Sequence, residues 1–257
     1  NVFNEAPRID YILTPAVKFA DEVIVIDKGS TDETGYLCSK YPGVKVINVG
    51  QSLHGEDDRK SWSEYSSNDW IWWGTGSEIP TRKCVEFARG LIDNHDFDLI
   101  RVPRKMYMLG VHHPNSPWNI SYYKFLFNRR RTIITNKIHH DFKAMNGKEG
   151  LVNYAADCCV YHLTYTSCEY WINTIVDYWK TEAKQSDDPA ADIARCMAAI
   201  ESKKAQLKAG GQELYLLDLA WQLYHLGTAF FLEEKRRGMD IKSEYKKIYD
   251  KVLREWE

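Results

Sequence analysis

The chain has 257 residues, of which 44% are hydrophobic and 27% are charged, and its formal net charge is −2. This length is sufficient to bury a large hydrophobic core, and the near-neutral charge argues against a general polyanion-binding surface, so nucleic acid is a poor candidate partner. No stretch approaches the roughly 18 apolar residues of a membrane span and no signal peptide is visible, so we expect a cytoplasmic protein, free in solution or peripheral to a membrane.

Strands and helices alternate at the start of the chain. Residues 1–4 have the pattern of the end of a strand. Residues 8–20 have helical periodicity, and Pro15 is expected to kink or shorten that helix. The elements predicted next are a strand over 23–27, a helix over 32–40 and a strand over 44–48. This βαβ order predicts a parallel sheet with helices on its faces.

A polar turn follows the strand predicted at residues 23–27. The apolar run ends at Asp27, and Gly29 and Ser30 come directly after it. Ser30 and Glu33 have the spacing of a capping box, which predicts that a helix begins there. Because ligands of open α/β sheets bind beyond the carboxyl ends of the strands, we expect the Asp27 carboxylate to face a ligand crevice. The alternative is a well-formed turn without a ligand.

This region resembles a known family. The pair Asn4-Glu5, residues 20–27 and residues 29–34 are similar, in order and spacing, to the opening of the family 2 inverting glycosyltransferases. The resemblance covers residues 1–165, strongly over the first part and loosely after Glu78. It implies a GT-A-type (Rossmann-like) α/β fold, with a mixed, mainly parallel sheet and flanking helices. It also implies transfer of a sugar from a nucleotide donor, with a UDP-sugar favoured, to an acceptor hydroxyl with inversion.

The resemblance assigns nucleotide-binding roles to several residues. Asp27 would contact the base, and Glu5 would help to hold the nucleoside diphosphate, with Asn4, Gly29 and Ser30 beside them. Arg59, on a helix predicted within residues 55–67, would reach toward the nucleotide. For Arg59 the alternative is a position on a charged, solvated helix face.

A second motif follows the strand predicted at residues 70–73. The loop Gly74-Thr75-Gly76-Ser77-Glu78 stands where the family carries its Asp-x-Asp motif. Paired carboxylates suit Mg²⁺ or Mn²⁺ bound to the donor diphosphate, whereas hydroxyl groups are poor ligands for such hard cations. Thr75, Gly76 and Ser77 are therefore predicted to contact phosphate directly, as other glycine-rich loops do.

Three interpretations of this loop stay open. The protein is a metal-independent enzyme, or it binds a divalent cation weakly through Glu78 and another ligand such as His162, or it is a non-catalytic relative. Glu78 is alternatively a charge at the start of the helix predicted over residues 80–94. His162 is alternatively a structural histidine.

Strands are predicted over residues 97–103, 105–111 and 121–128. The loop between the last two carries Trp118, which we expect on the acceptor side, where an aromatic ring can stack on a sugar. A plain surface loop is the alternative.

The pair His140-Asp141 is the best match to a His-Glu pair of the resembling family. An inverting transfer needs one base that deprotonates the acceptor hydroxyl as it attacks the anomeric carbon, and a carboxylate beside a histidine suits this role. Asp141 is therefore the predicted base, with His140 beside it and Glu78 as the alternative base. Hydrogen-bonding histidines at a strand end are the structural alternative.

The pattern changes to helices after residue 165. We predict a transferase domain over residues 1–165 and an α-helical domain over residues 166–257, with residues 214–232 as a buried central helix and a last amphipathic helix over 241–256. Such helices can bind a protein acceptor, mediate self-association or cover the sheet.

The sequence thus predicts a glycosyltransferase, either a hexosyl- or a pentosyltransferase, with a nucleotide-sugar donor. The acceptor is open among glycans, lipid-linked, protein and nucleotide acceptors. The main alternative is a nucleotide-sugar-binding or scaffold protein without catalysis. A nucleotidyltransferase of related fold is a weaker alternative, because no glycine-rich basic loop for a triphosphate is visible.

Overall fold

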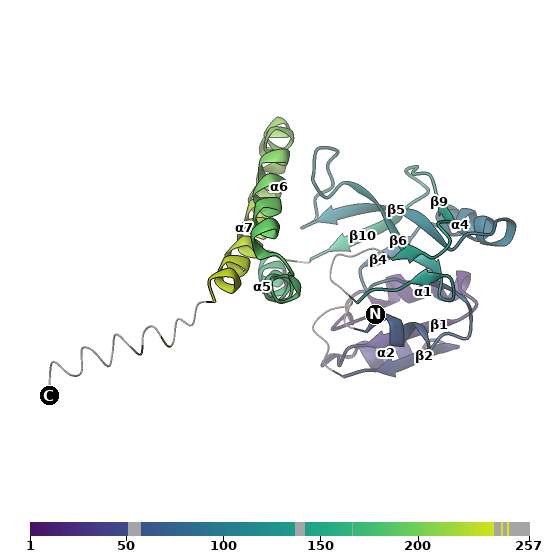
Figure 1. Ribbon diagram of the computed structural model, residues 1–257. Coiled ribbons are helices and arrows are strands. Elements are labelled where there is room, and N and C mark those ends of the chain that lie inside the picture. Colours follow the sequence, from purple (N-terminus) through teal and green to yellow (C-terminus); the bar gives the residue numbers. More distant parts are fainter. Residues whose placement is uncertain (51–57, 137–141, 166, 239–242, 244–245, 247–257) are drawn as a thin grey trace, which may run out of the picture. The chain divides into compact units, whose positions relative to one another are not determined.

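The computed structural model describes residues 1–50, 58–136, 142–165, 167–238, 243 and 246. Contacts between Cα atoms divide the chain into two compact units, Asn1–Trp171 and Ile172–Glu257. The domain boundary predicted after residue 165 stays a prediction. Figure 1 shows both units with many of their elements labelled.

The first unit opens with the predicted βαβ arrangement. Its elements are α1 (Ile9–Phe19), β1 (Val23–Asp27), α2 (Thr34–Ser39) and β2 (Val44–Asn48). The two strands form a parallel ladder from Val23 opposite Val44 to Asp27 opposite Asn48. Val2 pairs with the other edge of β1, where its N–H donates to the Ile26 carbonyl at 2.9 Å. α1 continues through Pro15, so the predicted parallel pair is confirmed and the proline does not end the helix.

A mixed sheet forms the rest of this unit. Its strands are β3 (Trp70–Trp72), β4 (Glu78–Pro80), β5 (Leu99–Met108), β6 (Ile120–Asn128), β9 (Glu149–Leu151) and β10 (Val160–Thr164). The order is β3-β6-β5-β10-β4, with β9 paired to β5. β5 runs parallel to β9 and β10, and the other ladders are antiparallel. Between β6 and β9 in the sequence, β7 (Thr132–Ile133) and β8 (Lys143–Ala144) form a short antiparallel pair.

The two strands predicted over residues 97–103 and 105–111 are one strand, β5. The ladder with β6 shifts its register between Ile100 and Val102, and Pro103 lies inside the strand opposite Tyr122. Proline ordinarily interrupts a central strand because it has no N–H. On the other side of β5, Pro103 lies between the residues that pair with β9, Leu99–Arg101, and those that pair with β10, Arg104–Met108. The sequence pattern did not reveal this arrangement.

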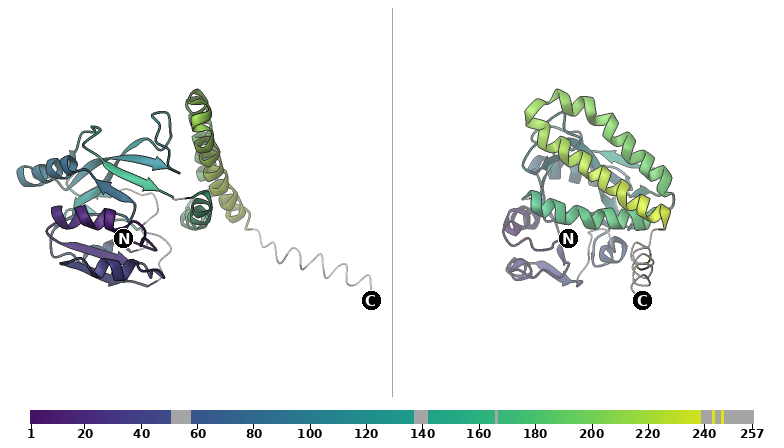
Figure 2. Two further views of the ribbon diagram at one scale, coloured as in Figure 1. Left: turned by 180° about the vertical axis from the view of Figure 1, so that it is seen from behind. Right: turned by 90° about the vertical axis from the view of Figure 1, so that its left-hand side faces the viewer.

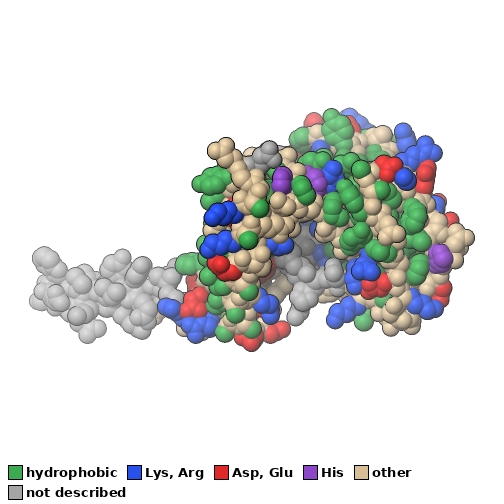
Figure 3. All heavy atoms as spheres, turned by 90° about the horizontal axis from the view of Figure 1, so that it is seen from above, with side chains coloured by type: hydrophobic (Ala, Val, Ile, Leu, Met, Phe, Trp, Pro, Cys, Tyr) green, Lys and Arg blue, Asp and Glu red, His purple; other side chains and the backbone are tan. Residues whose placement is uncertain are grey.

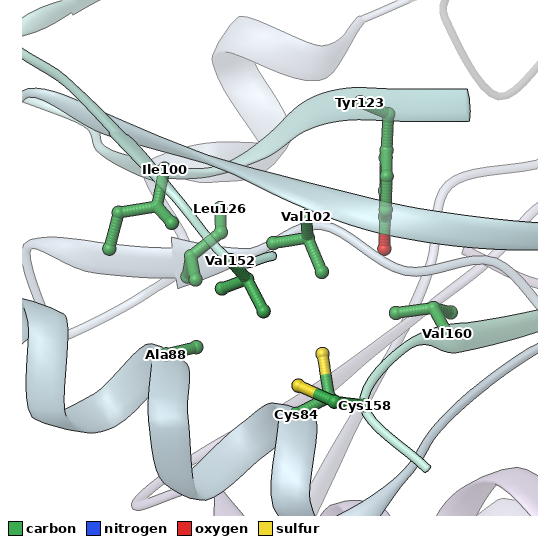
Figure 4. Packing of buried hydrophobic residues seen from close by; sticks show 9 residues of the cluster. All are labelled: Cys84, Ala88, Ile100, Val102, Tyr123, Leu126, Val152, Cys158 and Val160. Carbon is green, nitrogen blue, oxygen red and sulfur yellow. The ribbon is translucent and has the colours of Figure 1, made fainter. Parts of the chain in front are cut away.

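Helix α4 (Arg82–Asn94) closes the core against the mixed sheet (Figure 4). Thr81 caps it by accepting a hydrogen bond from the Cys84 N–H at 3.3 Å. Full burial of a large apolar side chain contributes about 1.5–3 kcal/mol, so the packing of α4 against the mixed sheet is a main source of the stability of this unit. The buried residues are Cys84, Ala88, Ile100, Val102, Tyr123, Leu126, Val152, Cys158 and Val160.

A second core cluster lies around the short helix α3 (Arg59–Ser63). The Trp62 and Trp73 rings stack at 6.1 Å between centroids. Leu99, Phe127 and Phe142 are fully buried with them. This cluster joins β1, β3 and β6.

The second unit consists of helices. They are most of α5 (Cys168–Gln185), α6 (Pro189–Ala209), the 3₁₀ turn η1 (Gly211–Leu214) and α7 (Tyr215–Arg237). α6 and α7 lie side by side (Figure 2). The Trp179 Nε1–H of α5 donates to the Tyr224 carbonyl of α7 at 2.8 Å, and the Trp221 Nε1–H donates to the Ala199 carbonyl of α6 at 3.1 Å.

The helix predicted over residues 214–232 is present as α7, but the prediction that it is buried is wrong. One face of α7 is buried at Leu217, Ala220 and Leu232, whereas the opposite face exposes Leu223 and Phe230. The described helices of this unit pack against one face of α7, which leaves the other without a cover. The last predicted helix lies largely outside the described residues.

Charges are mixed on the face drawn in Figure 3, where basic and acidic side chains are interspersed. In the part of the chain that the structure describes, no helix is long and apolar enough to cross a bilayer.

The contact between α5 and α7 requires a glycine. A Cβ added at Gly227 would lie 2.1 Å from Cε2 of the Trp179 ring. We expect Gly227→Ala to lower the free energy of unfolding by about 1–3 kcal/mol, the usual effect of overpacking, which thermal denaturation followed by circular dichroism measures. Gly90→Ala in α4 is the matched control, because a Cβ there meets no atom within 4 Å. An unchanged melting temperature for Gly227→Ala would contradict the packing described.

Candidate nucleotide-sugar site

The Asp27 carboxylate is held from two sides at the end of β1. Its Oδ1 accepts a hydrogen bond from the Ser30 N–H at 2.8 Å. Its Oδ2 lies 2.9 Å from the position that a Cβ would take at residue 35, so only glycine leaves room for the carboxylate there. Gly29 has a φ of 79°, a conformation that glycine adopts without strain. The turn therefore fixes one buried acid at a strand end.

The pair Asn4-Glu5 is interlocked with this turn. The Asn4 N–H donates to Ser30 Oγ at 3.0 Å, and the Thr31 N–H donates to Asn4 Oδ1 at 2.8 Å. The Glu5 N–H donates to Thr34 Oγ1 at 2.7 Å. The structure thus brings together Asn4, Glu5, Asp27, Gly29 and Ser30, which the resemblance had grouped.

The capping box predicted from Ser30 and Glu33 is wrong. α2 begins at Thr34, and its N-cap residue Glu33 makes no side-chain cap. Asp32 Oδ1 instead accepts the Thr34 N–H at 2.9 Å. Ser30 is occupied by Asn4, a partner 26 residues away that local spacing does not reveal.

Glu5 joins the turn to the loop at residues 74–78. A Cβ at Gly76 would lie 2.6 Å from Glu5 Cγ, so the Glu5 side chain packs directly on the loop backbone. Arg8 forms a two-point ion pair with Glu5 through Nε and Nη2, and its Nη1 donates to the Leu163 carbonyl of β10 at 2.9 Å. Sequence reasoning missed Arg8; its position three residues after Glu5 on a helix start was the available signal.

The loop is folded on itself. The Thr75 N–H donates to Glu78 Oε2 at 3.3 Å, and the Gly76 N–H donates to the Asn1 carbonyl at 3.1 Å. The Thr75 and Ser77 hydroxyls lie 3.0 Å apart. Two of the backbone donors that were expected to face phosphate are therefore already bonded within the protein, and the loop offers hydroxyl groups instead.

Glu78 is the first residue of β4, opposite His162 of β10. The alternative that placed it at a helix start is wrong, because α4 begins four residues later at Arg82 with its own cap. Its Oε1 lies 3.2 Å from Arg104 Nη1. Burial raises the pKa of Glu78, while the charge of Arg104 opposes that shift.

His162 lies beside this ion pair, with its Nδ1 3.9 Å from Glu78 Oε1. Burial, followed by the charges of Arg104 and Arg8, holds the pKa of His162 well below its usual value, so the imidazole is neutral at neutral pH. Nδ1 is buried and has no hydrogen-bond partner among the described residues.

These groups do not fit a Mg²⁺ or Mn²⁺ site. Both cations favour several oxygen ligands, whereas the one carboxylate of this loop, Glu78, is paired with Arg104. In the described ranges, no cluster of three or more His, Cys, Asp or Glu side chains could hold a metal ion.

Arg59 belongs to a second cluster. Its guanidinium lies over the rings of Phe125 and Phe142, at 4.9 and 5.4 Å from their centroids, and its Nη1 lies 3.5 Å from the Thr135 carbonyl. It is buried, so the solvated-face alternative is wrong. These contacts place it near the segment that leads to His140 and Asp141, which lie outside the described residues.

Trp118 is half-buried in the loop between β5 and β6, and its backbone N–H donates to Ser116 Oγ at 3.1 Å. This loop follows the carboxyl end of β5, which runs parallel to β10. Its acceptor-side role stays a prediction.

A cavity of about 470 Å³ lies next to the site, between β1 and β3. Its lining is mainly apolar, with Leu13, Val25 and Ile71 among the contributors, and it reaches the loop at Thr75 and Gly76. Its apolar walls do not suit a charged diphosphate.

The fold has likenesses among solved structures. Residues 1–349 of S. aureus TarS in complex with UDP-GlcNAc share 14% identity with this chain, with a TM-score of 0.45 and coverage of 93% of this chain and 91% of that one. The same TarS fragment in complex with UDP shares 13% identity, with a TM-score of 0.43 and coverage of 93% and 90%. A further TarS structure has 13% identity, a TM-score of 0.45 and coverage of 91% of this chain and 54% of that one. No curated protein matches the sequence.

A family model does match the sequence. The model described as Glycosyl transferase family 2 matches residues 2–150, which is more than half of the chain and includes the turn after β1 and the loop at residues 74–78. The family match, together with the mixed sheet, flanking helices and C-terminal helical region of the structure, confirms the predicted GT-A-type fold. The chain belongs to glycosyl transferase family 2.

Proposed function

We propose that this protein transfers a sugar from a UDP-sugar to an acceptor hydroxyl with inversion, and that it does so without a metal ion in the loop at residues 74–78. Family membership supports nucleotide-sugar glycosyl transfer in general. The observation that carries the specific proposal is the join between the Asp27 turn and this loop, made by Glu5 packed on Gly76. A base-binding turn and a phosphate-binding loop then belong to one site.

Asp27 supports UDP as the donor nucleotide. When it is ionised its carboxylate only accepts hydrogen bonds, and the N3–H of uracil is a donor that it can accept from. The carboxylate is buried and held by Ser30, so it is already oriented before the base binds. We assign Asn4, Gly29 and Ser30 to the base and ribose end of the donor.

The diphosphate is assigned to the Thr75 and Ser77 hydroxyls and two arginines, whereas the Gly76 N–H is already bonded to the Asn1 carbonyl. Departure of UDP places negative charge on the leaving oxygen, and fixed donors stabilise such charge. The hydroxyls of the loop and the guanidinium groups of Arg8 and Arg104 are donors of this kind. Glu5 and Glu78 hold those guanidinium groups in place.

Asp141 is assigned as the base that takes the proton of the acceptor hydroxyl, with His140 beside it. As the acceptor oxygen bonds to the anomeric carbon, the bond to UDP breaks on the opposite face, and the proton moves to the carboxylate. Glu78 is less suited to this step because its buried carboxylate already pairs with Arg104. We therefore assign Glu78 to holding the loop, and Trp118 to the acceptor side.

A non-catalytic nucleotide-sugar-binding protein is the second candidate. It is favoured by the bonded state of the Thr75 and Gly76 N–H groups, which leaves the loop fewer donors for phosphate. The two candidates share the donor site and differ in turnover.

Asp27 is expected to dominate nucleotide affinity. Asp27→Asn should weaken UDP binding by about 10- to 100-fold, because it replaces a charge-assisted hydrogen bond. Gly35→Ala should also weaken UDP binding, since its Cβ would displace Asp27 Oδ2. Alanine has a higher helix propensity than glycine, so this loss of affinity should not come from a weaker α2. Isothermal titration calorimetry measures both, with the exposed Asp93→Asn as control. Wild-type affinity in Asp27→Asn would remove Asp27 from the site.

Substitutions at Glu78 and Asp141 are expected to change different quantities. Asp141→Asn should lower kcat by about 10²- to 10⁴-fold, the usual contribution of a general base, with the UDP Kd unchanged. Glu78→Gln should raise the UDP Kd and lower the melting temperature, because it leaves Arg104 without its buried partner. The opposite pattern would make Glu78 the base.

Metal removal tests the charge balance. We expect UDP release from a panel of UDP-sugars to proceed equally with Mn²⁺ and with a chelator. Loss of turnover with the chelator would contradict the metal-free proposal. UDP binding without release of product would favour the non-catalytic candidate, and absence of both would contradict both candidates.

A further inference from the structure

The exposed side of α7 is apolar. Between Tyr215 and Phe230, every residue of this helix that is classed as exposed has a large hydrophobic side chain. A helix that faces water is normally polar on its outer side. These residues, with their exposed fractions, are Tyr215 65%, Leu216 39%, Leu219 47%, Leu223 40%, Leu226 48% and Phe230 72%.

Five of these side chains form a continuous line, which we call the α7 seam: Leu216, Leu219, Leu223, Leu226 and Phe230. Their spacing alternates between three and four residues, the spacing of the contact positions in coiled coils. At about 1.5 Å per residue the seam is about 21 Å long. Such a line is suited to pack against another helix.

The seam is not used inside the second unit. α7 contacts the other helices through its opposite side, where Leu217, Ala220 and Thr228 are buried. Thr228 Oγ1 donates to Glu182 Oε2 of α5 at 2.9 Å, and the Trp221 side chain bonds to α6. The stability of the described helices therefore does not explain the seam.

We propose that a second copy of this chain covers the seam, with the two α7 helices packed antiparallel around a two-fold axis at Leu223. A two-fold interface must be complementary to itself. The seam comes within one residue of this condition, because its other positions lie four and seven residues before Leu223 and three and seven residues after it. Leu216 of one copy then lies opposite Phe230 of the other, and Leu219 lies one residue, about 1.5 Å, out of line with Leu226.

Charge and area agree with this occupant. After Leu216 the first exposed charged residue of α7 is Lys235, so no exposed like charges meet along the seam. Each exposed side chain contributes on the order of 100 Å² of accessible surface. The five side chains of each copy then bury about 1,000 Å² in total, the size of a weak or transient interface. A dimer with a micromolar Kd is expected.

The other exposed apolar side chains of the described chain do not form a comparable line. Tyr11, Tyr36 and Phe87, for example, belong to three different helices. Single exposed apolar residues are normal on protein surfaces. The seam is therefore a separate feature, independent of the donor site.

Sedimentation equilibrium of the full chain from about 1 to about 100 µM tests the proposal. The wild type should change from monomer to dimer, and Leu223→Glu should weaken the dimer by about 100-fold or more, because two carboxylates would be buried on the axis. Ser202→Glu, at an exposed position of α6, should dimerise as the wild type does. UDP affinity should not change in either variant.

Cross-linking tests the orientation. In a background with the exposed Cys168 changed to Ser, Leu223→Cys should form a disulfide-linked dimer on oxidation, whereas Leu216→Cys alone should not. Equal cross-linking of both variants would indicate parallel helices and overturn the antiparallel arrangement.

Three results would overturn the proposal. The first is a wild type that stays monomeric over the whole concentration range. If Leu223→Glu then had a lower melting temperature than this monomer, another part of the same chain would cover the seam. A dimer that Leu223→Glu leaves intact would place the interface elsewhere. Sedimentation of a monomer with phosphatidylcholine and phosphatidylglycerol vesicles would assign the seam to a membrane surface.

Discussion

The Glu5 carboxylate is buried between Arg8 and the backbone of Gly76, and the two parts of the candidate site meet through it. The backbone N–H of Glu5 is bonded to Thr34 in the turn after β1, while its side chain rests on the loop at residues 74–78. One residue therefore sets the spacing between the acid at the end of β1 and the hydroxyls of the loop. A larger side chain at position 76 would separate them.

The charges of the site are balanced in a manner that suits a donor bound without a metal ion. Glu5 and Glu78, the acids nearest the loop, each pair with an arginine. Each carboxylate fixes a guanidinium group and so leaves the cation oriented, whereas an unpaired carboxylate would attract a divalent ion. The same pairs carry a cost, because burial of ions is unfavourable without good geometry. Burial likewise raises the pKa of Glu78, and burial of His162, followed by the charges of Arg104 and Arg8, lowers the pKa of that histidine.

Local sequence patterns predicted those parts of the fold in which neighbouring residues decide the structure. The parallel pair β1–β2 and the grouping of Asn4, Glu5 and Asp27 were predicted, the latter through the family resemblance. The failures have tertiary causes. Ser30 bonds to Asn4 across the turn instead of capping α2, and β5 continues through Pro103, which lies between the residues that pair with β9 and those that pair with β10. The Arg104–Glu78 pair joins residues 26 positions apart, so no spacing rule could identify it. The sequence predicted that the exposed side of α7 is buried, because an exposed apolar helix face and a buried one have the same pattern of hydrophobic residues.

The central claim is that the turn after β1 and the loop at residues 74–78 bind opposite ends of one nucleotide-sugar. A crystal structure of the protein with UDP tests it most directly. We expect the uracil N3–H within about 3.2 Å of the Asp27 carboxylate and the diphosphate within the same distance of the Thr75 and Ser77 hydroxyls, without a metal ion between them. UDP bound away from Asp27, or a divalent cation that bridges the diphosphate to Glu78, would contradict it.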